Sequence, residues 1–309
     1  KPYLSLISRV QAASKIFKPY NFDLWHSYHY GDDYTEPLIA RMSGARYWVY
    51  TKKNMNWYHN AWHLRSLFAS RIAAQNTDML QDFFDSPFYR RKVKLIPRGV
   101  DSEIFKPNVY PQMEFKRDHK IPNNAFLVGL VAHIVPVKGH PFLINAAAGL
   151  SKVHLIFAGK SLDEYYTRKL VEQVSSLGID DRVHFLGNVS DVTRLLGNLD
   201  VVVLPTRKRG EGCPVALLEA MSFSKACIAT DIPGARDIIK DGVSGLLVPP
   251  EDPGALAAAI TRLKEDPDLR RRLGNAARKR VEEHYTIEQE VAAHERLYLE
   301  LFEDCPQRP

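Results

Sequence analysis

The stretch from Leu199 to Met221 reads LDVVVLPTRKRGEGCPVALLEAM and decides the fold. Its segment Val201–Pro205 is continuously apolar, which is typical of a parallel strand buried on both faces. A basic loop follows, and a helix is predicted to begin at Pro214, because proline suits a first helical position, where its missing N–H would be unpaired anyway. The stretch therefore predicts a strand, a loop carrying Glu211, and a helix carrying Glu219.

Short apolar runs and helix-like segments alternate through the second half of the chain. The predicted strands are Phe126–Ile134, Val153–Gly159, Val183–Leu186, Val201–Pro205, Ala226–Thr230 and Gly245–Val248. The predicted helices are Lys138–Leu150, Asp163–Leu177, Asp191–Leu196, Pro214–Phe223, Ala235–Asp241 and Pro253–Lys264. This alternation predicts an α/β fold with a parallel sheet covered by helices.

The first half has a weaker pattern of the same kind. Strands are predicted at Phe22–Ser27, Arg46–Thr51, Ile72–Gln75 and Val93–Ile96, a helix near Tyr34–Ser43, and an interdomain linker at Pro97–Pro122. A length of 309 residues suits two domains. We expect a first Rossmann-like domain over residues 1–110, a second over residues 111–285, and a final helical segment over residues 286–309.

Composition and charge narrow the class of protein. Apolar residues make up 45% and charged residues 25%, as in soluble globular proteins. No run approaches the roughly 18 apolar residues of a membrane span, no signal peptide opens the sequence, and the cysteines Cys213, Cys227 and Cys305 are scattered and odd in number. These features favour a reducing cytoplasm over a disulfide framework.

The net charge of +6 is concentrated in residues 1–120, where Lys and Arg outnumber Asp and Glu. Such a basic half suits an anionic ligand or peripheral contact with an anionic membrane, and equally a solubilising surface. Nucleic acid is a weaker interpretation, because the basic run Arg90–Lys94 has no interleaved aromatic residues.

The loop that holds Glu211 predicts a ligand site. Ligands of open parallel sheets bind beyond the carboxyl ends of the strands, and a helix start there offers N–H groups to an anion such as phosphate. The available backbone donors are Gly212, Cys213, Val215 and Ala216. Glu211 and Glu219 would then accept hydrogen bonds from hydroxyl groups on either side, and two diols flanking a diphosphate describe a nucleotide sugar. The alternative is that both glutamates are simply solvated.

Several segments, in a fixed order, resemble one family. EGCPVALLEAM resembles the E-x7-E signature of retaining GT-B glycosyltransferases of family 4. The segments that resemble other family motifs are KLIPRGVDSEIFKP, LVAHIVPVKGH, HLIFAG, VHFLGNV, LDVVVLPT and ATDIPGARDIIKDGVSGLLVPPEDPGALAAAI. The resemblance runs from about Phe22 to the end, and nothing before Phe22 resembles the family's opening strand and Gly-rich loop. We therefore expect an N-terminally incomplete first domain.

The resemblance implies a GT-B fold and retaining transfer of a sugar from a UDP, GDP or ADP donor to a sugar or glycolipid acceptor, without a metal or other cofactor. It implies that Glu211, Gly212 and Cys213 contact the donor sugar and that Glu219 binds the ribose. It also implies that Val215, Ala216 and Lys138 meet the diphosphate and that Asn188 and Val189 border the base. Lys138 would neutralise the diphosphate as it leaves.

The chain departs from the family pattern at several positions. His133 stands where the family has an arginine, so the fixed charge would come from Lys160, Arg207 or Arg209, or His133 would hydrogen-bond a phosphate. In the first domain, His26 matches a family histidine on the acceptor side. Lys52 and Lys53 follow the next strand, where many members carry a histidine, and would meet the diphosphate or an anionic acceptor, or form an ordinary basic loop.

Other functions remain to be weighed. A non-catalytic nucleotide-sugar-binding protein of the same fold is the main alternative. An NAD-dependent dehydrogenase is disfavoured, because no G-x-G-x-x-G follows a predicted strand, and no motif indicates the pyridoxal phosphate lysine of a sugar phosphorylase. The resemblance further implies that the last helix, Ile287–Phe302, crosses back to the first domain, whereas its sequence position favours a cap on the second sheet.

Overall fold

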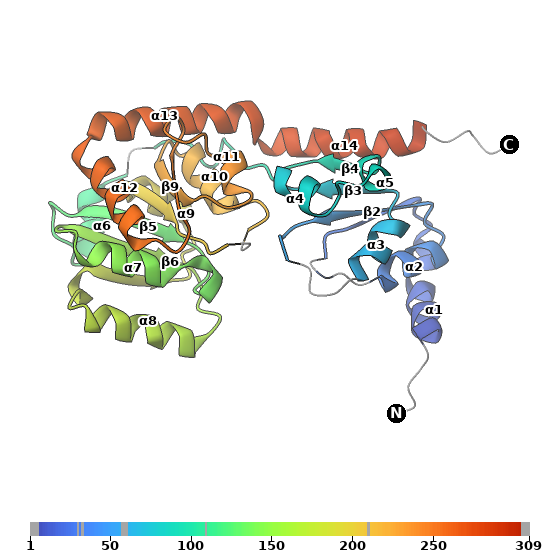
Figure 1. Cartoon of the computed structure of the whole chain (residues 1–309), viewed down its shortest axis with the longest axis horizontal. Coiled ribbons are helices and arrows are strands. Elements are labelled where there is room, and N and C mark those ends of the chain that lie inside the picture. The colour runs from blue at the N-terminus through green and yellow to red at the C-terminus, as the bar shows by residue number, and fades with distance from the viewer. Residues whose placement is uncertain are drawn as a thin grey trace. The chain divides into compact units, whose positions relative to one another are not determined.

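The computed structural model describes residues 6–29, 31, 34–56, 61–108, 110–208 and 211–303 of an α/β protein. The chain divides into two compact units (Figure 1). Unit 1 comprises Lys1–Pro97 with Glu290–Pro309, and unit 2 comprises Arg98–Gln289. The units divide after Pro97 and after Gln289, whereas the sequence predicts boundaries at residues 110 and 285.

Unit 2 is built on a six-stranded sheet in the order β10-β9-β8-β5-β6-β7, and every paired neighbour is parallel. The strands are β5 (Phe126–Val131), β6 (Val153–Ala158), β7 (Val183–Gly187), β8 (Val201–Leu204), β9 (Ala226–Thr230) and β10 (Leu246–Val248). All six lie within a residue or a few of the predicted runs. The strand order reverses between β5 and β8, which makes this a doubly wound sheet with a topological switch point there.

Helices on both faces of this sheet bury its apolar residues in one continuous core (Figure 1). The helices are α6 (Gln112–Asp118), α7 (His140–Ala148), α8 (Glu164–Ser176), α9 (Val192–Asn198), α10 (Val215–Ser222), α11 (Ala235–Ile238), α12 (Pro253–Glu265) and α13 (Pro267–His284), with short 3-10 turns at Pro136–Lys138 and Asp180–Arg182.

Two helices of unit 2 differ from expectation. The predicted linker contains α6, which is ordered because Phe115 packs into the core and the buried Lys116 ammonium donates to the carbonyl oxygens of Asn123 and Ala125, both at 2.9 Å. No element was predicted for α13. It forms because Leu269, Leu273, Ala277 and Val281, spaced four residues apart, are buried in the core although charged residues surround them.

Unit 1 has a four-stranded parallel sheet in the simple order β1-β2-β3-β4. Its strands are β1 (Leu24–Ser27), β2 (Tyr47–Lys52), β3 (Arg71–Ala74) and β4 (Val93–Leu95), each close to a predicted strand. Its helices are α1 (Leu6–Phe17), α2 (Thr35–Met42), α3 (Ala61–Phe68), α4 (Thr77–Asp82) and α5 (Pro87–Arg90), with a 3-10 turn at Lys18–Tyr20. Trp48, Ile72 and Phe84 are fully buried in its core.

The last helix, α14 (Ile287–Glu303), packs against the sheet of unit 1 (Figure 1). Leu297 and Leu301 are buried with Val49, Ala73 and Ile96 in a separate apolar cluster. In addition, the ring of Phe302 lies 5.1 Å from that of Tyr47, and the Tyr298 hydroxyl lies 2.5 Å from His26 Nδ1. All these partners precede Asn123, so the end of the chain completes the first unit rather than capping the second sheet.

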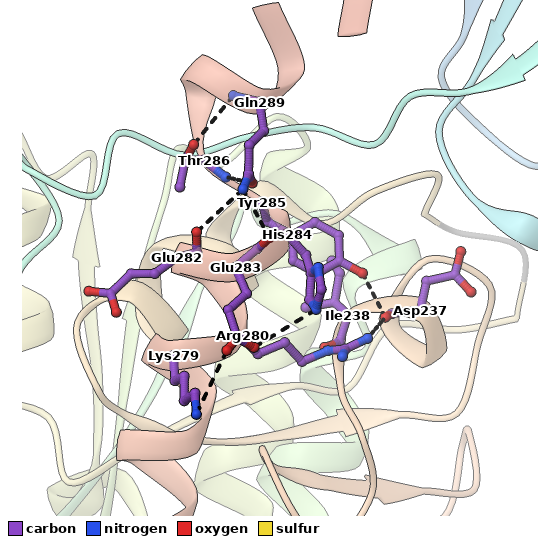
Figure 2. Close-up of polar contacts among 10 residues, drawn as sticks. All are labelled: Asp237, Ile238, Lys279, Arg280, Glu282, Glu283, His284, Tyr285, Thr286 and Gln289. Atoms are coloured by element: carbon purple, nitrogen blue, oxygen red, sulfur yellow. Dashed lines mark hydrogen bonds and ion pairs between the residues drawn. The ribbon is translucent and has the colours of Figure 1, made fainter. Parts of the chain in front are cut away.

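The junction between α13 and α14 is held by polar contacts shown in Figure 2. Thr286 N–H donates to Gln289 Oε1 (3.0 Å), and Gln289 N–H donates to Thr286 Oγ1 (3.3 Å), which is the reciprocal pattern of a capping box. The amide of Gln289 also donates to the carbonyl oxygen of Glu283 (2.9 Å), at the end of α13. One side chain therefore serves the end of one helix and the start of the next.

Among the residues that the structure describes, no helix has the length and apolar character needed to cross a membrane.

Candidate functional site

A cavity of about 490 Å³ lies in unit 2 at the carboxyl ends of the strands on either side of the switch point. Parallel sheets of this order bind ligands in that crevice. The cavity is lined by Val131, Ala132, His133, Lys138, Ala158, Gly159, Lys160, Asn188, Val189, Val192, Leu204, Glu211, Pro214, Val215, Ala216 and Glu219. Eight of the predicted site residues are therefore together in one cavity: His133, Lys138, Asn188, Val189, Glu211, Val215, Ala216 and Glu219.

Lys138 and Glu211 form an ion pair within this cavity, between Nζ and Oε1. Their side chains are only 22% and 12% exposed, so little water screens the pair. Thr206 lies just after β8, and its Oγ1 is 3.5 Å from Glu211 Oε1. A cation and an anion are thus fixed side by side in the cavity, although 73 residues separate them along the chain.

The turn that presents Lys138 depends on the next residue, Gly139. Its φ of +73° lies in the left-handed region, and a Cβ atom there would come within 1.9 Å of the Pro205 carbonyl oxygen. Glycine avoids both the strained conformation and the clash. The backbone after Lys138 therefore packs directly against the end of β8.

The N-terminus of α10 forms another part of the cavity wall. The helix begins at Val215, so Pro214 is the cap residue and not the first helical residue, because its ψ of 96° is extended. The first intrahelical bond runs from Leu217 N–H to the Pro214 carbonyl (3.0 Å). Val215 and Ala216 thus lie where a helix directs backbone N–H groups and partial positive charge outward, the arrangement that suits an anion.

Glu219 lies deeper on α10 and also lines the cavity. Burial raises the pKa of its carboxyl group from 4.5 to about 7. Hydroxyl donors would stabilise the ionised form, because a carboxylate accepts hydrogen bonds more strongly than a neutral carboxyl group. The alternative that Glu219 is an exposed helix residue is wrong.

Gly212 and Cys213 are not among the cavity-lining residues. The Gly212 carbonyl oxygen faces Gly234, where an added Cβ would come within 2.3 Å of it, and Cys213 packs against the hydrophobic core. Gly234 precedes α11, whose end is fixed by α13: Arg280 donates to the carbonyl oxygens of Ile238 and Asp237 (Figure 2). The proposed contacts of Gly212 and Cys213 with a sugar remain predictions.

The candidates for the positive charge near His133 differ in their surroundings. His133 is exposed at the cavity and Lys160 also lines it, whereas Arg207 Nε is bound to Glu251 Oε1 at 2.8 Å. Arg209 lies outside the described residues. Lys160, which lies just after β6, therefore lines the cavity together with Lys138.

The candidates in unit 1 have structural partners. His26 Nδ1 meets the Tyr298 hydroxyl and Nε2 meets Thr51 Oγ1 (2.8 Å), which joins α14 to two strands. Burial, with the charges of His294 and Lys53, lowers the pKa of His26 to about 3, so its ring is neutral. The sequence offered no sign of this role, since Tyr298 is far away along the chain.

The two lysines after β2 differ in environment. Lys52 is buried, and its ammonium donates to the Asn54 carbonyl (2.5 Å), the Asn54 side chain (3.1 Å) and the Asn56 carbonyl (3.2 Å). The Lys53 ammonium lies 5.2 Å from the centre of the Tyr28 ring. Lys52 therefore shapes its own loop, and the acceptor-side roles of His26, Lys52 and Lys53 remain predictions.

The doubly wound sheet and its cavity define a Rossmann-type ligand-binding protein. The model of the family "Glycosyl transferases group 1" matches residues 111–280, which include all of this cavity, and the chain belongs to that family. The chain is 34% identical to the putative glycosyltransferase EpsD of Bacillus subtilis over 207 residues, covering 64% of this chain and 53% of that protein. It thus spans about half the length of the curated relatives it matches.

Solved structures show the same two-sheet GT-B architecture. A glycosyltransferase from Rickettsia africae has a TM-score of 0.86 at 21% identity, with 99% of this chain and 83% of that chain covered. Anabaena Alr3699/HepE, in complex with UDP and glucose, has a TM-score of 0.83 at 22% identity, with 96% and 84% covered. At such identities the likeness establishes the fold.

Proposed function

We propose that the protein transfers a sugar from a nucleotide diphosphate sugar to an acceptor hydroxyl, with retention of configuration at the anomeric carbon. The observation that carries this proposal is one cavity that brings together Lys138, the N-terminus of α10 and the carboxyl groups of Glu211 and Glu219. Lys138 and the N-terminus of α10 suit a diphosphate. The carboxyl groups of Glu211 and Glu219 suit the hydroxyl groups of a sugar and a ribose.

The chemistry follows from this arrangement. When the bond between the anomeric carbon and the diphosphate breaks, negative charge develops on the departing oxygen. Lys138 and the N–H groups of α10 stabilise that charge in a partly desolvated site, where fixed dipoles are most effective. The acceptor oxygen forms the new bond to the anomeric carbon on the face that the diphosphate leaves, and it gives up its proton to the departing diphosphate oxygen. We propose that no metal ion is required, because this lysine and helix supply the positive charge.

The ion pair between Lys138 and Glu211 gives the donor a defined way to bind. A diphosphate attracts Lys138, and the sugar hydroxyls replace the ammonium as donors to Glu211. The exchange leaves Lys138 paired with the diphosphate and Glu211 hydrogen-bonded to the sugar, which matters because a partly buried charge without a partner is costly. The acceptor, a sugar or a glycolipid in this proposal, would be met by the basic first half of the chain, as would an anionic membrane face.

Donor hydrolysis tests the proposal without knowledge of the acceptor. The protein is incubated with UDP-, GDP- and ADP-sugars, with and without EDTA, and release of the nucleotide diphosphate is followed. Release that needs Lys138 and persists in EDTA supports a metal-independent transferase. Binding of a donor with no release, even with a panel of sugar acceptors, would instead identify a non-catalytic nucleotide-sugar-binding protein.

A further inference from the structure

A second cavity, of about 340 Å³, opens beside the first within unit 2. The two cavities share Asn188 and Val189, in the loop between β7 and α9. The second cavity is lined by Phe115, Asp118, His119, Leu186, Asn188, Val189, Ser190, Asp191, Arg194 and Leu195. A ligand whose diphosphate and ribose occupy the first cavity can therefore extend past this loop into the second.

The polar groups of the second cavity include two carboxylates and a guanidinium. Asp191 Oδ1 accepts from Arg194 N–H (2.8 Å) and from the Thr193 hydroxyl (2.7 Å), which caps α9 and lowers the pKa of Asp191, so this group is ionised. Asp118 Oδ2 lies 4.0 Å from Arg194 Nη2. The same cavity therefore presents acceptors for N–H donors and a donor for carbonyl or ring-nitrogen acceptors.

We propose that this second cavity receives the nucleobase of the donor and that the base is guanine. The inference rests on the proposed function and narrows it to a GDP-sugar. Guanine carries two neighbouring N–H donors, N1–H and the 2-amino group, which match a carboxylate. Its O6 and N7 are acceptors that suit an arginine. Phe115, Leu186, Val189 and Leu195 supply the apolar surroundings that a flat ring requires.

Other bases fit these groups less well. Adenine presents an acceptor, N1, where guanine presents N1–H, so a carboxylate there would face a lone pair. Uracil has a single N–H between two carbonyl oxygens and reaches less far as a one-ring base. Asp118 and Asp191 are exposed, so the preference comes from the charge-assisted hydrogen bonds that guanine forms with a carboxylate and the other bases do not. The carboxylates therefore favour guanine.

Calorimetric titration of the protein with GDP, inosine diphosphate, ADP and UDP tests this inference. Inosine diphosphate differs from GDP only by lacking the 2-amino group. We expect GDP to bind at least about tenfold more tightly than each of the others, the size of one lost hydrogen bond to a charged group.

Two conservative substitutions test the carboxylates. Asp118→Asn and Asp191→Asn remove charge and keep size, and asparagine still caps a helix. The double variant should bind GDP and inosine diphosphate equally, should bind UDP within about twofold of the unchanged protein, and should keep its melting temperature.

Three other outcomes would contradict the choice of base, the role of the carboxylates or the proposed function. If UDP or ADP binds more tightly than GDP, guanine is the wrong base and the nucleotide site remains. If GDP is preferred but the double variant keeps that preference over inosine diphosphate, these carboxylates do not read the base. If none of the four nucleotides binds, the proposed function fails as well.

Discussion

Glu219 shows how its place on a helix changes the chemistry of one side chain. A solvated glutamate is fully ionised at neutral pH, whereas burial raises the pKa of Glu219 to about 7. A ribose that donates hydroxyl groups to this carboxylate favours its ionised form and lowers the pKa again. If Glu219 binds the ribose as proposed, nucleotide binding is coupled to loss of a proton from Glu219, and this contribution to affinity grows as the pH rises through 7.

We predict that the affinity for GDP increases between pH 6 and pH 8 more in the unchanged protein than in the Glu219→Gln variant. The comparison is needed because the terminal phosphate of GDP titrates in a similar range. At pH 8, Glu219→Ala should weaken binding by about tenfold or more, from loss of hydrogen bonds to a charged acceptor. Calorimetry at three pH values measures this. Parallel pH profiles for the unchanged protein and the Glu219→Gln variant would show that the Glu219 carboxylate does not bind the ribose.

Lys138 is expected to act mainly as the leaving group departs. We predict that Lys138→Ala lowers kcat for donor hydrolysis by about a hundredfold, as loss of one preorganised stabilising group does, and changes donor Kd much less. Lys169→Ala, on the exposed face of α8, is the control. An effect confined to Kd would mean that Lys138 binds the ground state and the transition state equally.

At the scale of elements, the turn before α7 couples the position of Lys138 to the end of β8. Gly139 has a φ of +73° and faces the Pro205 carbonyl, whereas Gly149, at the other end of the same helix, has a φ of −84° and open space around it. The two glycines therefore differ in both respects that decide whether alanine is tolerated.

We predict that Gly139→Ala destabilises the protein by about 1–3 kcal/mol or more and reduces hydrolysis, because the added methyl group displaces the backbone beside Lys138. Gly149→Ala should be neutral or stabilising by about 0.4–1 kcal/mol, since it restricts only the unfolded chain. Denaturant unfolding compares the two. Equal stabilities for both variants would show that contact with Pro205 is dispensable.

The elements that the sequence predicted best are those with a local signal. The central strands β5 and β8 of unit 2 are unbroken apolar runs, and a parallel strand buried on both faces requires such runs. Helix α13 has a regular apolar spacing. Its many charged residues lower its apolar content, so a search for apolar runs does not predict it. The sequence of helix α6 carries no local signal and predicts a linker, because the burial of Phe115 depends on residues distant in sequence.

The same division applies to the candidate site. Glu211, Lys138 and the loop at Asn188 follow the carboxyl ends of strands, and Glu219 lies on the helix that begins beside Glu211, so the shared edge of the sheet brings them together. By contrast, the packing of Gly212 on Gly234 is a tertiary contact that spacing does not encode. The second cavity is likewise a product of tertiary packing, since α6 forms one wall and the start of α9 another.

At the scale of the whole molecule, the chain passes between its two units twice. It leaves unit 1 after Pro97 and returns to it at Glu290. Most of the length of α14 therefore belongs to the core of unit 1, where Leu297 and Leu301 are 2% and 4% exposed. The residues that line the candidate site lie in unit 2, so the stability of unit 1 and the proposed nucleotide binding should respond to different substitutions.

We predict that Leu297→Ala and Leu301→Ala each destabilise unit 1 by about 2–5 kcal/mol, the usual result of a cavity in a packed core. Leu299→Ala, on the same helix but 59% exposed, should change stability by less than about 0.5 kcal/mol. Hydrogen exchange resolves the effect by region: protection should fall in β2, β3 and β4 and stay unchanged in β5 to β10. GDP affinity should also be retained, because the cavity residues all lie in unit 2.

If Leu301→Ala proved as harmless as Leu299→Ala, α14 would not be part of the unit 1 core in solution. If protection instead fell equally in both sheets, the two units would unfold as one, and the helix would stabilise the whole molecule.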